Sequence, residues 1–198
     1  MRRTVSSPPQ APHGSSDQPG HGSGAERGPN DQLGRENTVE FDVLVEIPKG
    51  QRNKYEVDHK SGRIRLDRTL FTAMTYPADY GFIEDTLGED GDPLDALVIL
   101  SEPTFPGCLV KCRAIAIFSM VDEKGPDAKI VAVPADDPRY AHLQDVSDLP
   151  TFDTAAIQHF FEEYKVLESG KEVRGEGWYG KAAADAEITA AIERAKSH

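Results

Sequence analysis

The sequence contains little cysteine: its 198 residues include only Cys108 and Cys112. Two cysteines cannot form the disulfide framework of a small secreted domain, and no Cys or His pair flanks them at the spacing of a zinc site. Both fall on one face of a predicted strand, where a small core residue is the ordinary interpretation and a redox role is the alternative. We therefore expect a reducing compartment.

Long apolar runs and positive charge are also scarce. No stretch approaches the ~20 apolar residues of a membrane-spanning helix, and no hydrophobic segment follows the basic start Met1-Arg2-Arg3. Lys and Arg number 22 against 34 Asp and Glu, which gives a formal net charge of −12. Nucleic acids and anionic membranes require a positive field, so we expect neither as a partner. The expected location is the cytoplasm.

Residues 1–36 differ in composition from the rest of the chain. They hold five Pro, six Gly and five Ser but no aromatic residue. Such a segment cannot bury enough apolar surface to offset its ordering entropy, which predicts a disordered tail. A dispensable tail, a functional tail and a misassigned start codon all remain open. The length suits one folded domain over 37–198.

In that domain the patterning favours strands first and helices last. Apolar and polar residues alternate over 39–47, and the turn His59-Lys60-Ser61-Gly62 joins two strands as a hairpin. Residues 75–81 are expected to be a loop, and Trp178 a packing or capping residue. The predicted strands are 39–47, 54–58, 63–67, 96–100, 109–121 and 129–133, and the predicted helices are about 150–170 and 181–196. This order predicts an α+β fold, a small β-barrel with helices packed outside.

The turn Asp90-Gly91-Asp92-Pro93-Leu94-Asp95 carries three carboxylates directly before an apolar run. Anions at this spacing repel one another unless a cation lies between them. Oxygen ligands without Cys or His favour a hard divalent ion, Mg²⁺, Mn²⁺ or Ca²⁺, over zinc. An EF-hand loop is excluded because its sixth position is Asp95 rather than Gly and its twelfth is Ser101 rather than Glu. An ordinary solvated turn is the alternative.

Further charged residues lie at other predicted element ends. A second acidic cluster follows the strand 109–121, and basic and tyrosine residues accompany both clusters. This combination indicates one site in which carboxylates hold divalent cations while Lys, Arg and Tyr bind oxygens of an anionic ligand. A phosphate compound and phosphoryl transfer to water fit that division. The added residues are Glu46, Lys54, Glu56, Arg68, Asp122, Glu123, Asp127, Lys129, Tyr164 and Lys165.

From about residue 39 to 196, the order and spacing of several motifs closely resemble the family I soluble inorganic pyrophosphatases. The resemblance implies an OB-like five-stranded β-barrel with flanking C-terminal helices. It also implies Mg²⁺-dependent hydrolysis of pyrophosphate to two orthophosphates, with about three or four Mg²⁺ per site, in a homohexamer. The motifs are Val45-Glu46-Ile47-Pro48, Asn53-Lys54-Tyr55-Glu56-Val57-Asp58, Leu66-Asp67-Arg68, Tyr76-Pro77-Ala78-Asp79-Tyr80-Gly81, the acidic turn, Val121-Asp122-Glu123, Asp127-Ala128-Lys129 and 159–165.

The resemblance also implies roles for individual residues. Asp92 is the implied general base, acting on a water that bridges two metal ions. The implied metal ligands are Glu46, Glu56, Asp90, Asp95, Asp122 and Asp127, and the implied substrate-binding residues are Lys54, Arg68, Tyr80, Lys129, Tyr164 and Lys165. Seven carboxylates then face four cationic side chains, so the site repels an anionic substrate unless divalent cations are present.

Two other functions compete with this one. A non-catalytic divalent-metal or phosphate-binding barrel does not require the joint presence of Lys54, Arg68, Tyr164 and Lys165. An OB-type nucleic-acid module conflicts with the net charge of −12. Glu56 and Glu123 are equally open to a role as ordinary surface partners of Lys and Arg. His59 and His142 fall in predicted loops, where surface or interface residues are more common than ligands.

Overall fold

The computed structural model describes residues 38–197, so the predicted tail over 1–36 lies outside the described residues. The two helices are α1 (Thr151–Glu163) and α2 (Lys181–Lys196), and two short 3-10 turns, η1 (Pro138–Tyr140) and η2 (Val146–Asp148), precede α1. The strands are β1 (Glu40–Ile47), β2 (Asn53–Asp58), β3 (Arg63–Thr69), β4 (Asp79–Ile83), β5 (Asp95–Val98), β6 (Leu109–Asp122), β7 (Gly125–Pro134) and β8 (Val173–Gly180).

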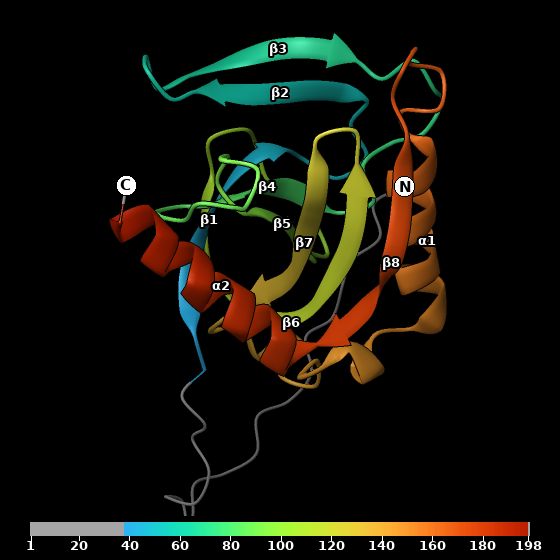
Figure 1. The fold of residues 1–198 in the computed structure, drawn as a ribbon. Helices are drawn as coiled ribbons and strands as arrows, with labels where there is room; N and C mark the ends of the chain where they lie inside the picture. The colour runs from blue at the N-terminus through green and yellow to red at the C-terminus, as the bar shows by residue number, and fades with distance from the viewer. Residues whose placement is uncertain (1–37, 198) are drawn as a thin grey trace, which may run out of the picture. The chain divides into compact units, whose positions relative to one another are not determined.

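Five strands close into a barrel in the order β1-β4-β5-β7-β6, because β1 also pairs with β6. Neighbours in this ring run antiparallel except β5 and β7, which are parallel. Strand β8 extends the sheet beyond β6, and β2 and β3 form a separate hairpin, drawn above the barrel in Figure 1. Helix α2 packs on β6 and α1 on β8. The predicted α+β barrel with C-terminal helices is therefore confirmed.

The strands form where apolar side chains can enter the barrel. In β1 the alternating pattern buries one face, while β4 and most of β6 are buried on both faces. Cys112 is fully buried in β6, where it acts as a small core residue. Cys108 lies just before the strand, since the turn at Gly107 delays the start of β6. The buried residues of β1 are Phe41, Val43, Val45 and Ile47.

Two strands were not expected from the sequence. Strand β4 overlaps the predicted loop 75–81, although all five of its residues are buried. Gly81 permits this placement because a Cβ there would lie 1.9 Å from the carbonyl oxygen of Leu44 on β1. Strand β8 is rich in glycine and lacks apolar alternation, yet its backbone pairs with β6 along the whole segment. Both strands therefore form through backbone pairing rather than through an alternating side-chain pattern.

Aromatic packing between the barrel and α1 sets the position of two predicted site residues. The rings of Tyr80 and Phe161 lie 6.0 Å apart, and those of Phe160 and Tyr164 stack at 5.1 Å. Both tyrosines are largely buried, so only their hydroxyl ends are free to serve a polar site. The cluster consists of Tyr76, Tyr80, Phe118, Phe160, Phe161 and Tyr164.

We expect Gly81→Ala to destabilise the protein more than Gly50→Ala. The methyl added at residue 81 clashes with the Leu44 backbone. At residue 50 the methyl has open space, and the only cost is backbone strain, because φ there is 81°. The clash should lower the free energy of unfolding by about 3 kcal/mol, and the strain alone by about 1 kcal/mol. Urea unfolding measures both. Equal losses in the two variants would contradict the close β1–β4 approach.

Candidate active site

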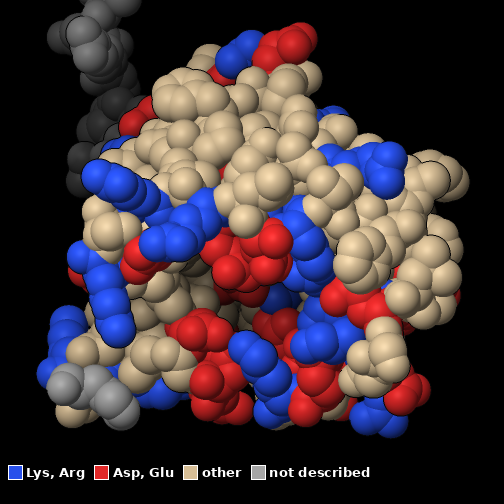
Figure 2. Space-filling view, turned by 90° about the horizontal axis from the view of Figure 1, so that it is seen from above, with Lys and Arg blue, Asp and Glu red and all other residues tan. Residues whose placement is uncertain are grey.

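The predicted site residues converge on the face of the molecule next to the β2–β3 hairpin. Figure 2 shows Asp and Glu side chains mixed with Lys and Arg around a hollow on this face. The residues come from most of the barrel: Glu46 from β1, Lys54 and Glu56 from β2, Arg68 from β3, Tyr80 from β4, Asp95 from β5, Asp122 from β6, Asp127 and Lys129 from β7, and Tyr164 and Lys165 from the end of α1.

The centre of the site is a buried lysine between two carboxylates. Lys129 Nζ lies 2.5 Å from Asp95 Oδ2 and 2.5 Å from Asp127 Oδ1. The parallel pairing of Ala96 with Ile130 brings β5 and β7 into the register that makes this contact possible. Burial alone would lower the pKa of Lys129, but the two carboxylates raise it overall, so the ammonium stays charged.

Tyr80 completes this centre from β4. Its hydroxyl donates to Asp95 Oδ2 at 2.5 Å. Burial raises the pKa of Tyr80 well above the usual value, and the neighbouring charges of Asp95 and Asp127 add to the rise. The phenol therefore remains a neutral donor, able to offer its proton to a carboxylate or to a ligand oxygen.

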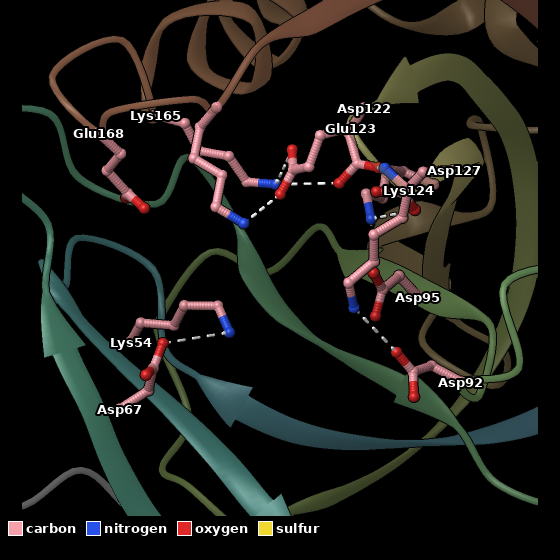
Figure 3. Close-up of polar contacts among 12 residues, drawn as sticks. Lys54, Asp67, Asp92, Asp95, Asp122, Glu123, Lys124, Asp127, Lys165 and Glu168 are labelled. Carbon is pink, nitrogen blue, oxygen red and sulfur yellow. Dashed lines mark hydrogen bonds and ion pairs between the residues drawn. The ribbon is translucent and has the colours of Figure 1, made fainter.

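A second group of ion pairs lies where α1 ends above the β6–β7 turn. Lys165 Nζ is 3.0 Å from Asp122 Oδ2 and 3.6 Å from Glu123 Oε2 (Figure 3). Lys171 also binds Glu123. Burial disfavours the charged form of Asp122, yet hydrogen bonds from the Lys124 N–H and from Lys165 lower its pKa overall. Asp122 is thus an ionised carboxylate at the rim of the site.

The hairpin supplies the third group. Lys54 binds Glu56 and lies 3.6 Å from Asp67, and Arg68 binds Asp67 and Glu168. The structure therefore pairs Glu56 with a lysine of the predicted site, just as it pairs Glu123 with Lys165 and Lys171.

Glu46 links the hairpin to the barrel. Its Oε1 accepts the backbone N–H of Val57 at 2.7 Å. Burial raises the pKa of Glu46 to about 7, and the negative charge of Asp95 adds to the rise. The hydrogen bond from Val57 lowers the pKa but does not offset these effects. The Glu46 carboxylate thus supports β2, although burial disfavours its charged form.

The acidic turn is split between the centre and the rim. Asp95 is partly buried, whereas Asp90 and Asp92 are exposed. Asp92 Oδ2 lies 3.6 Å from Lys124 Nζ, and its backbone N–H donates to Asp90 Oδ1. A cavity of about 390 Å³ is lined by Asp90, Asp95 and Asp127 together. The turn and β7 thus line one cavity, whose other walls come from β6, β8 and α2.

The side chains fit a hard divalent cation by their chemistry. Within residues 38–197, no three His, Cys, Asp or Glu side chains already stand at metal-binding separation. The candidate ligands are all carboxylates. Burial raises the pKa of Asp127, and the charges of Asp95 and Asp122 add to the rise although Lys129 opposes it. Oxygen ligands under mutual repulsion are the donor set that Mg²⁺ binds, since added positive charge relieves the repulsion.

Several supporting residues were missed by the sequence reasoning. Arg194 on α2 donates from Nε to the Leu87 carbonyl at 2.8 Å and is held by Glu187 at 2.6 Å, which ties the acidic loop to the last helix. The buried Thr86 hydroxyl also accepts the Leu94 N–H. Nothing near these residues in the sequence signals the contacts, because their partners are distant or are backbone atoms.

The two histidines lie apart from these groups. The ring of His59 meets that of Phe82 edge-on at 5.3 Å, and His142 is exposed. Their contacts give neither a ligand role.

The comparisons with known proteins agree with this geometry. The family model described as "Inorganic pyrophosphatase" matches residues 43–196. The chain is 63% identical over 158 residues to the inorganic pyrophosphatase of Streptomyces coelicolor, covering 80% of this chain and 97% of that protein. It is 58% identical over 159 residues to that of Corynebacterium efficiens, covering 80% and 100%. The crystal structure of inorganic pyrophosphatase from Thermus thermophilus matches with a TM-score of 0.78 at 47% identity, covering 83% and 95%.

The pKa of Glu46 predicts a pH dependence of stability. Its value of about 7 in the folded protein, against 4.5 for an unperturbed Glu, means that the folded state binds more protons between these pH values. Through this group, the free energy of unfolding of the metal-free protein should fall as pH rises across that window, by up to roughly 3 kcal/mol. Glu46→Gln should remove this fall. Urea unfolding in EDTA from pH 5 to pH 8 measures it.

The exposed Glu102 provides a control at another site. Glu102→Gln should follow the wild-type pH profile, while the stability of Glu46→Gln relative to wild type increases with pH. Parallel profiles for all three proteins would show that Glu46 ionises normally.

Proposed function

The chain belongs to the inorganic pyrophosphatase family, and we propose that it hydrolyses inorganic pyrophosphate to two orthophosphates with Mg²⁺ as its cofactor. The observation that carries this proposal is the pairing of Lys129 with Asp95 and Asp127 at the centre of the predicted site. One site then offers both an anion-binding lysine and cation-binding carboxylates. A non-catalytic barrel is not favoured, because the named relatives are pyrophosphatases.

The family resemblance assigns the carboxylates to two overlapping sets of metal ligands. When bound, Mg²⁺ neutralises phosphoryl charge and lowers the pKa of water. As the family resemblance implies, Asp90, Asp95 and Asp127, which all line one cavity, would hold one activating ion, and Asp95 would also contribute to a second. Asp122 and Asp127, with Glu46 and Glu56, would hold ions that arrive with substrate. Three or four ions per site are enough to reverse the excess of carboxylates over cationic side chains.

The remaining residues bind and position the reactants. The cationic side chains and the two tyrosine hydroxyls donate to phosphate oxygens, and together they position the substrate. Asp92 accepts a proton from the attacking water. Its carboxylate is exposed at the rim, where it forms a 3.6 Å ion pair with Lys124, so it is accessible to an attacking water. The binding residues are Lys54, Arg68, Lys129, Lys165, Tyr80 and Tyr164.

Assembly and location are carried over from the family resemblance. We propose a homohexamer and a cytoplasmic location, with pyrophosphate as the partner molecule. Neither helix within residues 38–197 has the length and apolarity needed to cross a bilayer. Sedimentation of the purified chain measures the assembly.

We expect Asp92→Asn to retain the fold and lose about 10²- to 10⁴-fold in kcat for orthophosphate release from pyrophosphate, because the proton acceptor is gone. Asp85→Asn is the matched control: it removes the same charge from an exposed position of the same loop, and Asn tolerates the positive φ of 57° there. Turnover of Asp92→Asn within a few-fold of wild type, with both variants folded by circular dichroism, would contradict the role of Asp92.

Asp95→Asn should raise the Mg²⁺ concentration for half-maximal activity by at least about tenfold, because a neutral amide replaces the charged carboxylate of a proposed ligand. The rise in melting temperature on adding Mg²⁺ should shrink as well. Glu89→Gln changes an exposed residue of the same cavity lining without altering a proposed ligand. If both variants shift the magnesium dependence equally, general charge explains the effect and the ligand assignment of Asp95 is wrong.

A further inference from the structure

The guanidinium of Arg68 is held by carboxylates from two distant segments. Its Nε and Nη2 donate to Glu168 Oε1 at 3.0 and 2.8 Å, and its Nη1 donates to Asp67. Glu168 lies 100 residues further along the chain, and its side chain is only 10% exposed. Figure 3 shows Glu168 extending from the loop after α1 toward the side of the site where Lys54 and Asp67 lie.

These contacts leave a defined part of the guanidinium unused. An arginine carries five N–H donors in one rigid plane. Glu168 occupies the edge formed by Nε and Nη2, and Asp67 takes one donor of Nη1. One N–H on each terminal nitrogen therefore remains available to the oxygens of a phosphate. The direction of these N–H groups follows from where Glu168 lies.

The loop that carries Glu168 is itself anchored in the site. The Glu168 N–H donates to the Lys165 carbonyl at 2.8 Å, and the Lys171 N–H donates to the Glu168 carbonyl at 3.3 Å. Both lysines bind carboxylates at the β6–β7 turn. Because β2 and β3 form a sheet separate from the barrel, the Arg68–Glu168 contact links the hairpin to the opposite wall of the site.

We propose that Glu168 is a positioning residue for substrate binding: it fixes the orientation of Arg68 and does not itself touch the substrate. The proposal rests on the function proposed above, in which Arg68 binds a phosphate group. Asp67 cannot supply this orientation alone, because it is the chain neighbour of Arg68 and moves with the hairpin. Glu168 holds the guanidinium from outside the hairpin.

Replacing Glu168 separates orientation from charge. Glu168→Ala removes a negative charge near an anion-binding site, which by electrostatics alone should lower the KM for magnesium pyrophosphate. Loss of orientation acts in the opposite direction, because Arg68 must then be ordered when substrate binds. We expect KM to rise about 3- to 10-fold with kcat within twofold, since an interaction present in both ground and transition states is weakened.

Three further variants isolate the path through Arg68. Glu168→Gln keeps an oxygen acceptor for both nitrogens and should restore KM to within about twofold of wild type. Glu172→Ala removes a charge from an exposed residue of the same segment and should not raise KM. In the Arg68→Ala background, Glu168→Ala should have no additional effect on KM, because the group it orients is absent.

The outcomes distinguish this proposal from the proposed function. If wild type releases no orthophosphate, the function fails, and calorimetric binding of imidodiphosphate with Mg²⁺ to the same variants decides the role of Glu168. If wild type is active but Glu168→Ala leaves KM unchanged or lowers it, the positioning role is overturned. An undiminished effect of Glu168→Ala in the Arg68→Ala background overturns it too. Thermal unfolding confirms that each variant is folded.

Discussion

The buried contact of Lys129 with Asp95 and Asp127 is the interaction on which the rest of the site depends. It joins β5 to β7, which form the parallel pair of the ring within residues 38–197. A charge removed from water is tolerated only with a partner, and breaking such a pair costs about 3–5 kcal/mol. The two strands must therefore keep the register that brings these groups together. The other ion pairs surround this centre at the ends of neighbouring strands, so the barrel and the charge arrangement support each other.

The resting site satisfies its cations with its own carboxylates. Lys54 lies beside Glu56, Arg68 beside Glu168, and Lys165 beside Asp122. This pairing explains how so many charged groups fit together at one face of the folded protein. It also means that phosphate and divalent cations enter together most easily, because each releases the partners that the other requires. Burial raises the pKa of Glu46 to about 7, so this carboxylate is not fully compensated by its neighbours.

The sequence predicted those parts of the fold in which local pattern and tertiary structure agree. Alternation located β1, and the helix 181–196 was predicted with the bounds that α2 has. Strands β4 and β8 were missed because Gly81 and the glycines of β8 serve close backbone approach rather than side-chain packing. At the site, motif spacing led to residues that converge as expected. The contacts of Glu168 and Arg194 were not predictable, since each joins segments about 100 residues apart or more.

Closure of the barrel between β1 and β6 has a kinetic consequence. Glu40 pairs with Arg113 and Leu44 with Leu109, so the ring is completed by residues distant along the chain. Chain entropy must be lost before such contacts form, and folds dominated by them reach the native state in milliseconds to seconds rather than microseconds. Glu46 follows directly on these pairs, and Asp95 and Asp127 belong to strands on the other side of the ring. We therefore expect the carboxylates of the site to come together late in folding, when the ring closes rather than when the acidic turn forms.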